Sequence, residues 1–289
     1  MTYKEIYYTS QEGLRLYARE YGDRRAPKIP VICLPGLTRN AKDFHDLATR
    51  LSAERRVICP DLRGRGKSEY ASGWAGYTAD AEMRDTLDLM SVTGVEHAIL
   101  IGTSRGGLVS MSMGLNRPGA IKAVIMNDVG PEVDPAGISR ILGYAGKMKV
   151  PESWSDAAIL LRQMNEREFP NVSGEDWHAF ARNTFKDVDG KPALDYDAAI
   201  GKSLQRAAKL LRGQFPTLWK EFLSLSHVPV LLIRGENSDL LSKETADKMV
   251  EKHTDLTLVT VKDRGHAPFL NEPEVLSAID TFLTRLDKA

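Results

Sequence analysis

The chain has 289 residues, which is long enough for one large domain that carries a sizeable insertion. Lysine and arginine together number 39, as do aspartate and glutamate, so no net charge would attract nucleic acid or an anionic membrane. No apolar run approaches the roughly 18 residues of a membrane span, and the polar start of the chain resembles neither a secretion signal nor a transit peptide. We therefore expect a cytoplasmic protein whose partner is a small molecule.

The chain begins with a predicted β-hairpin, in which residues 5–10 and 14–21 flank Glu12 and Gly13. From residue 31 onward, short apolar strands alternate with helices, a pattern typical of a parallel sheet with right-handed crossovers. The expected strands are 31–34, 57–60, 98–101, 123–127, 229–235 and 256–261. The expected helices are 43–51, 78–93, 105–116 and a last one that starts at Glu272. The sequence thus predicts an α/β fold.

About a hundred residues between the strands at 123–127 and 229–235 break this alternation. A structureless loop of that length is implausible in a compact domain, so we expect a unit with its own fold. Helical patterns occur within it at 156–164 and 203–215. It also contains three tryptophans, which either form the core of this unit or, for one or two of them, line the roof of a pocket. They are Trp154, Trp177 and Trp219.

The two cysteines, Cys33 and Cys59, each lie in a short apolar strand-like run. We expect both to be buried as small hydrophobic residues. Two cysteines without a nearby histidine cluster do not make a zinc site at any familiar spacing, so we expect no metal.

The segment "GTSRG" places Ser104 on the turn between a buried strand and a helix. Gly102 and Gly106 stand two residues before and two residues after the serine. Glycines at these positions let the backbone bend sharply and let the helix approach the strand, as a G-x-S-x-G nucleophile elbow requires. Ser104 is therefore the candidate nucleophile.

A serine hydroxyl needs a base and an orienting acid, and candidates for both follow later strands. His266, in "DRGHAPF", lies between the last strand and the last helix, and Asp239, in "RGENSD", follows the strand at 229–235. The order serine, acid, histidine is that of the α/β-hydrolase triad, and the ends of parallel strands share one edge of the sheet. Asp128, directly after the strand at 123–127, is the competing acid. We prefer Asp239, since Asp128 can instead brace the entry to the insertion.

Together, the elbow and four loop segments resemble the α/β-hydrolase superfamily, more narrowly its single-domain bacterial members with a helical cap. The segments are "LPGLTRN", "DLRGRGKS", "RGENSD" and "GHAPFLNEPE". This resemblance spans essentially the whole chain and implies a mostly parallel, twisted sheet with helices on both faces. It implies a hydrolase core of residues 1–129 and 227–289 and a helical cap of residues 130–226. Serine at position 104 distinguishes the chain from the similar dehalogenases and epoxide hydrolases, which use an aspartate nucleophile.

The resemblance also implies roles for the individual residues. His266 would take the proton of Ser104, Asp239 would orient the imidazole, and the backbone amides of Leu37 and Arg105 would form an oxyanion hole. The chain has Pro35-Gly36 where many members have histidine-glycine, but the hole needs only a backbone N–H. The side chain of Arg105 would either pair with the scaffold or bind a substrate carboxylate. No metal or organic cofactor is required.

The expected reaction is hydrolysis of a small to medium carboxylic ester or lactone through an acyl-enzyme. An alternative is hydrolytic carbon–carbon cleavage of a vinylogous diketone, which the same triad performs in similar proteins. Acyl transfer to an acceptor other than water uses the same intermediate. A different class of function is a receptor that binds a ligand in the capped pocket without turnover. The sequence carries no signature of an oligomeric state.

Overall fold

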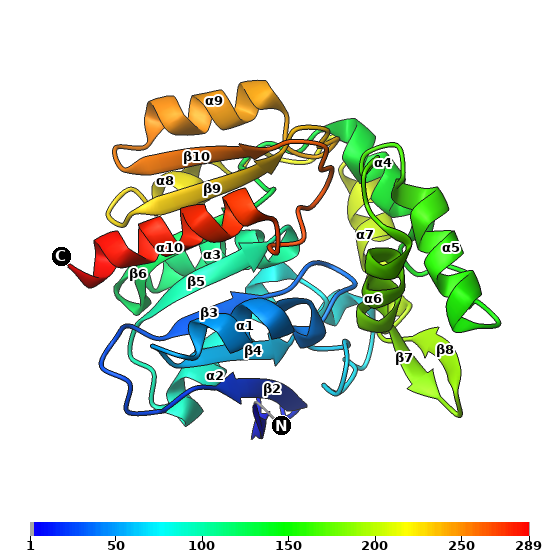
Figure 1. Cartoon of the computed structure of the whole chain (residues 1–289), viewed down its shortest axis with the longest axis horizontal. Helices are drawn as coiled ribbons and strands as arrows, with labels where there is room; N and C mark the ends of the chain where they lie inside the picture. The colour runs from blue at the N-terminus through cyan, green and yellow to red at the C-terminus, as the bar shows by residue number, and fades with distance from the viewer. Residues whose placement is uncertain (1–2, 289) are drawn as a thin grey trace.

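The centre of the molecule is an eight-stranded sheet, seen in a computed structural model that describes residues 3–288 (Figure 1). Its order is β1-β2-β4-β3-β5-β6-β9-β10, with β1 and β2 as an antiparallel hairpin at one edge. From β4 to β10 every neighbouring pair is parallel, as the alternation of strands and helices predicts. The strands are β1 Lys4–Thr9, β2 Arg15–Tyr21, β3 Val31–Leu34, β4 Val57–Asp61, β5 Ala98–Thr103, β6 Ile121–Asn127, β9 Val230–Gly235 and β10 Leu256–Val261.

Helices cover both faces of this sheet, which explains why its central strands are apolar throughout. One face packs against α1 (His45–Leu51) and α10 (Pro273–Asp287). The other face packs against α2 (Ala79–Thr93), α3 (Arg105–Asn116), α8 (Trp219–Leu223) and α9 (Lys243–Lys252). Short 3-10 turns occur at Ala41–Phe44, Trp74–Gly76 and Pro118–Ala120.

Both cysteines lie in the core on the α1 and α10 side of the sheet, as free and fully buried thiols. Their expected burial is confirmed. In the described part of the chain, no three or more acidic, histidine or cysteine side chains are grouped as ligands for a metal ion. None of the helices within residues 3–288 combines the length and the apolar character that a bilayer crossing requires.

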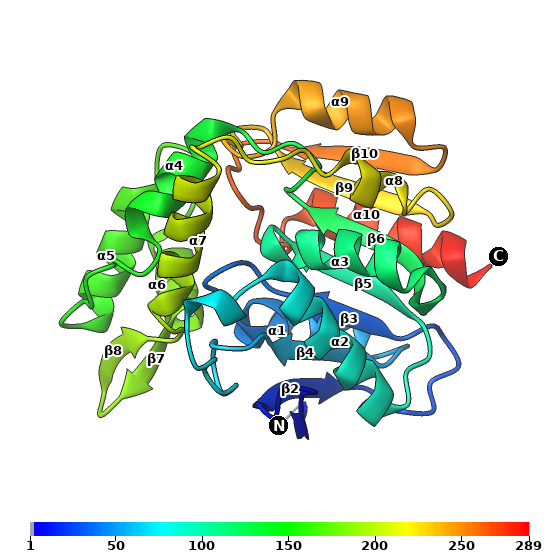
Figure 2. The same ribbon diagram turned by 180° about the vertical axis from the view of Figure 1, so that it is seen from behind.

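The chain between β6 and β9 forms a separate layer beyond one end of the sheet (Figures 1 and 2). Its elements are α4 Pro135–Tyr144, α5 Trp154–Asn165, α6 Gly174–Thr184, the hairpin of β7 Phe185–Val188 and β8 Lys191–Leu194, and α7 Ala199–Leu210. Within this layer, α5 and α6 bury an apolar cluster of their own around Trp177 and Phe169. The two helical patterns read in the sequence fall on α5 and α7, whereas α4, α6 and the hairpin have no counterpart in that interpretation.

Helix α8 lies within the predicted insertion but packs elsewhere. Trp219, Phe222 and Leu225 join the main core beside α3 rather than the cluster of α5 and α6. The fit is tight, because a Cβ on Gly114 of α3 would stand 2.5 Å from the side chain of Leu225. We therefore propose that the cap ends before residue 218, about eight residues earlier than the expected boundary at 226.

Candidate active site

Ser104 occupies the corner between β5 and α3, with φ 50° and ψ −111°. The glycines around it allow a close packing that no side chain would permit. A Cβ on Gly102 would stand 2.5 Å from the backbone of Gly106, and a Cβ on Gly106 would stand 2.0 Å from the carbonyl oxygen of Leu34 on β3. This packing holds the start of α3 against β3 and β5 and turns the Ser104 hydroxyl outward, as an elbow does.

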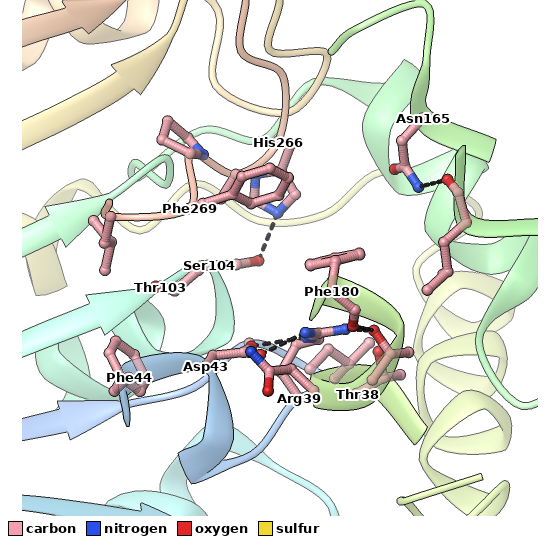
Figure 3. Close-up of a pocket in the computed structure, with 18 of the residues that line it drawn as sticks. Thr38, Arg39, Asp43, Phe44, Thr103, Ser104, Asn165, Phe180, His266 and Phe269 are labelled. Atoms are coloured by element: carbon pink, nitrogen blue, oxygen red, sulfur yellow. Dashed lines mark hydrogen bonds and ion pairs between the residues drawn. The ribbon is translucent and has the colours of Figure 1, made fainter. Parts of the chain in front are cut away.

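His266 meets this hydroxyl from the loop between β10 and α10. Its Nε2 lies 2.8 Å from Ser104 Oγ, the contact drawn in Figure 3. The imidazole is almost completely buried, with 8% of its side chain exposed. The structure therefore brings together the two residues that the sequence analysis selected as nucleophile and base.

Asp128, directly after β6, contacts the other nitrogen of the same ring. Its Oδ2 lies 2.8 Å from His266 Nδ1, and its side chain is fully buried. Two further donors fix the carboxylate: the Gly235 amide donates to Oδ1 at 2.8 Å, and the Ser238 hydroxyl donates to Oδ2 at 2.5 Å. A carboxylate at Nδ1 favours the tautomer that carries its proton there, which leaves Nε2 free to accept the proton of Ser104.

The structure contradicts the expectation that Asp239 orients the imidazole. The Asp239 carboxylate instead accepts two hydrogen bonds from Arg140 of α4, at 2.6 and 2.8 Å. Although burial opposes the effect, the hydrogen bonds and charge of Arg140 hold the pKa of Asp239 below its usual value. Both aspartates follow strands at the same edge of the sheet, but only Asp128 points to His266. Asp128, the competing acid of the sequence analysis, therefore takes the position predicted for Asp239.

Two backbone amides next to Ser104 have the location that an oxyanion hole requires. The loop after β3 borders the serine, since a Cβ on Gly36 would lie 3.9 Å from Ser104 Cβ. Arg105 is the first residue of α3, where an amide has no partner within its helix. Within residues 3–288, neither the Leu37 nor the Arg105 N–H donates to a backbone or side-chain acceptor. Both amides are therefore available to a ligand.

A buried arginine supports the loop that carries Leu37. Arg65 Nε donates to the Leu37 carbonyl at 2.8 Å, and its Nη1 pairs with the fully buried Glu82 at 2.7 Å. The same Glu82 accepts from Arg105 Nε at 2.6 Å, and Arg105 Nη2 donates to the Tyr77 carbonyl at 3.2 Å. Of the two alternatives for the Arg105 side chain, the structure thus shows pairing with the scaffold rather than contact with substrate.

A cavity of about 220 Å³ lies between Ser104 and the helices of the cap. Its walls combine apolar and polar side chains, and Figure 3 shows Phe180 and Phe269 near the Ser104–His266 contact. The apolar lining residues include Phe44, Leu47, Ile141, Met148, Leu161, Met164, Phe180, Phe269 and Leu270. Polar lining residues include Thr38, Arg39, Asp43, Arg140, Tyr144, Asn165, Asn183 and Thr184.

None of the three tryptophans proposed as substrate contacts is among the residues that line this cavity. Trp177 belongs to the apolar cluster of the cap. Trp154 lies at its edge, donates to the Gly190 carbonyl and is covered by Arg182. Trp219 packs in the main core and donates to Glu132 at 2.6 Å. The interpretation as core residues is therefore the one that the structure supports.

The sequence analysis missed the aromatic and charged residues that line the cavity instead. Phe269 follows His266 by three residues in "GHAPF", and Arg39 follows Leu37 by two in "LTRN", so both are near positions already selected. Proximity in sequence to a predicted catalytic residue would have identified these two. Phe180, Arg140 and Tyr144 come from cap helices, where the sequence offers no comparable signal.

Comparisons with known proteins identify the family of the chain. The sequence model described as "Alpha/beta hydrolase family" matches residues 31–279. A 3-hydroxybutyrate-oligomer hydrolase of Cupriavidus necator is 31% identical over 281 residues, which is 95% of each chain. A 2-(acetamidomethylene)succinate hydrolase of Mesorhizobium japonicum is 27% identical and covers 86% of this chain and 85% of its own. The crystal structure of an alpha/beta hydrolase from Novosphingobium aromaticivorans superposes with a TM-score of 0.90 at 41% identity, over 98% of this chain and 99% of that one.

Proposed function

We propose that this chain, which belongs to the alpha/beta hydrolase family, hydrolyses a carboxylic ester through an acyl-enzyme on Ser104. The matches confirm the family and the fold class expected from the sequence. The observation that carries the proposal is the continuous contact from Ser104 through His266 to Asp128, with 2.8 Å at each step.

In the first half of the reaction, Ser104 Oγ attacks the acyl carbon while His266 Nε2 takes the hydroxyl proton. The amides of Leu37 and Arg105 donate to the oxyanion, and Asp128 stabilises the imidazolium. The ester bond then breaks, and His266 returns the proton to the leaving alcohol. In the second half, the same ring removes a proton from water, which attacks the acyl-enzyme and releases the carboxylic acid and Ser104.

We infer a small to medium ester from the size and lining of the cavity. Its volume of about 220 Å³ lies below the range of roughly 300–1,000 Å³ that is common for ligand pockets. The 3-hydroxybutyrate-oligomer hydrolase, whose name describes the cleavage of ester-linked hydroxy acids, supports an ester in preference to other acyl compounds. Lactones contain the same reacting group and belong to the same proposal.

Turnover measurements on the purified protein test this function. We expect hydrolysis of short-chain 4-nitrophenyl esters, with a burst of nitrophenol where deacylation is slower than acylation. Ser104→Ala should lower kcat by at least about 10³-fold. Ser91→Ala, on the exposed side of α2, is the matched control and should keep wild-type turnover.

Other substrate classes give this experiment its contrary outcomes. A vinylogous diketone cleaved faster than every ester and lactone would replace the proposed reaction with carbon–carbon hydrolysis. Tight binding of a ligand without any turnover would replace it with the receptor function. Ester hydrolysis that survives in Ser104→Ala would exclude Ser104 as the nucleophile.

A further inference from the structure

We infer that the cavity contains a subsite for a carboxylate of the substrate, formed by Arg140 and Tyr144 of α4 within the field of Arg39. This inference rests on the proposed function, because it names the class of ester that the same site accepts. All three residues line the cavity with Ser104 and His266. Arg140 and Tyr144 stand four residues apart in one helix, so their side chains lie on the same face.

Arg140 is held in one orientation while part of its donor capacity stays unused. Its Nε and Nη2 donate to the two oxygens of Asp239, and 26% of its side chain is exposed. Within residues 3–288, its Nη1 has no hydrogen-bond acceptor. A guanidinium carries five N–H donors in a rigid plane. Because Asp239 binds the Nε–Nη2 edge of Arg140, the remaining N–H donors of Arg140 are available to a ligand. Asp239 thus pre-orients Arg140 at the cavity wall.

Tyr144 supplies a second donor next to this guanidinium. Its hydroxyl makes no hydrogen bond to any other group in the described part of the chain, although the residue is only partly exposed. Burial raises the pKa of Tyr144, and the charges of Arg140 and Arg39 oppose that effect. The phenol therefore stays protonated and able to donate near neutral pH.

Arg39 is fixed on the core side of the cavity, in the loop after β3. It donates to both oxygens of Asp43, at 2.7 and 2.5 Å, and to the Thr184 hydroxyl, and its guanidinium lies 4.3 Å from the centre of the Phe180 ring. Figure 3 shows Arg39 between Asp43 and Phe180, on the side of the cavity opposite His266. Its donors are mostly occupied and Asp43 balances much of its charge, so Arg39 contributes less to the subsite than Arg140 does.

The unused nitrogen of Arg140 can only donate, and the Tyr144 hydroxyl beside it can donate as well, a combination that favours a negatively charged acceptor. Asp43 and Asp239 do not compete for it, because both carboxylates are already paired with the arginines. The other acidic side chains of the cavity, Asp46 and Asp176, are exposed to solvent, where their charge is screened. A carboxylate matches planar guanidinium donors better than a neutral oxygen does and forms the stronger hydrogen bonds.

Two pairs of esters that differ only in charge test this inference. The first pair is 3-(butanoyloxy)butanoate and the corresponding primary amide, which place the charge on the alcohol side of the ester. The second pair is the 4-nitrophenyl half-ester of glutaric acid and 4-nitrophenyl glutaramate, which place it on the acyl side. In at least one pair, kcat/KM of the wild-type protein should favour the carboxylate by about tenfold to a hundredfold, mainly through KM, as expected for hydrogen bonds to a charged group.

The variants separate the subsite from general damage. Tyr144→Phe removes one donor and should reduce the preference several-fold. The double change Arg140→Met with Asp239→Asn removes the guanidinium without leaving an unpaired, partly buried carboxylate and should bring the ratio close to one. Arg162→Gln, an exposed arginine of α5 outside the cavity lining, is the control and should keep the wild-type ratio.

The outcomes distinguish this inference from the proposed function. Equal turnover of the charged and neutral members of both pairs would overturn the carboxylate subsite alone and leave the esterase proposal standing. A preference that the double variant retains would also overturn it. If the protein turned over neither the four esters nor the neutral short-chain esters, the proposed function and the inference would be overturned together.

Discussion

The identity of the acid gives the sharpest prediction about the chemistry, because one amide substitution changes the tautomer of His266. In Asp128→Asn, the amide oxygen would keep the hydrogen bond from Gly235, which binds Oδ1 in the wild type. The amide nitrogen would then replace Oδ2 and face Nδ1 of His266, 2.8 Å away. An NH₂ group donates to Nδ1 and moves the ring proton to Nε2, so the ring no longer accepts the proton of Ser104.

The expected loss is large for a substitution that hardly changes shape. The equivalent change in a serine protease lowers kcat about 10⁴-fold, which corresponds to about 5 kcal/mol of transition-state stabilisation. We expect Asp128→Asn to show a loss of this order in kcat for a neutral 4-nitrophenyl ester, at unchanged circular dichroism and thermal midpoint. Asp239→Asn is the matched control, and its kcat for the same ester should fall by less than about tenfold.

The comparison of the two variants decides between the acids. A loss in Asp239→Asn that exceeds the loss in Asp128→Asn at matched folding stability would show that Asp239 orients the base during turnover. In that case the contact between Asp128 and His266 would be structural only.

The remaining predictions concern packing and pH. In Gly106→Ala, the free energy of unfolding in urea should fall by at least several kcal/mol, since the new Cβ would meet the Leu34 carbonyl oxygen at 2.0 Å. A wild-type urea midpoint would contradict the elbow packing. Trp177→Ala should lower the free energy of unfolding by about 3–5 kcal/mol with little change in ester selectivity, because Trp177 packs against Phe269 behind the cavity wall. A several-fold change in selectivity at wild-type stability would be contrary evidence. Burial raises the pKa of Asp61 to about 6, so the folded state binds more protons than the unfolded state between about pH 4 and 6. Relative to Asp61→Asn, the wild-type free energy of unfolding should therefore fall as pH rises through this window, and a difference that is flat or rises would refute the assignment.

The main sheet follows from the sequence because its signals are local. Apolar and β-branched residues at 31–34, 98–101 and 256–261 are long enough for a strand, and each range lies within an observed strand, which in the second case extends to Thr103. The helix at 105–116 is also predicted locally, because Leu108, Met111 and Leu115 recur at helical spacing after the glycines of the elbow. The cap elements gave weaker signals: α6, for example, buries Trp177, Ala181 and Thr184, and apart from Ala179 and Phe180 its other side chains are polar.

The choice between the two acids depends on contacts that no local pattern encodes. Asp128 and Asp239 both follow buried strands, and each has the chemistry to orient a histidine. The structure separates them through partners that lie far away in sequence. Gly235 and Ser238 hold Asp128 toward His266, and Arg140 draws Asp239 to the cap.

The prediction that the tryptophans contact substrate is wrong for a similar reason. Aromatic composition predicts burial, and all three are buried or partly buried, but it does not tell which surface covers them. Trp219 packs against the core because α8 returns to α3 before β9 begins. The aromatic rings that do line the cavity come from both parts of the chain: Tyr144 and Phe180 from the cap, and Phe44 and Phe269 from the core.

Covalent labelling tests the central claim, that Ser104 is the nucleophile of this hydrolase, most directly. A 4-nitrophenyl phosphonate should add one equivalent to the wild-type protein, and peptide mass spectrometry should place the label on Ser104. Ser104→Ala should take up no label under the same conditions, whereas the Ser91→Ala control should be labelled like the wild type. A label on another residue, or equal labelling of the Ser104→Ala protein, would contradict the account.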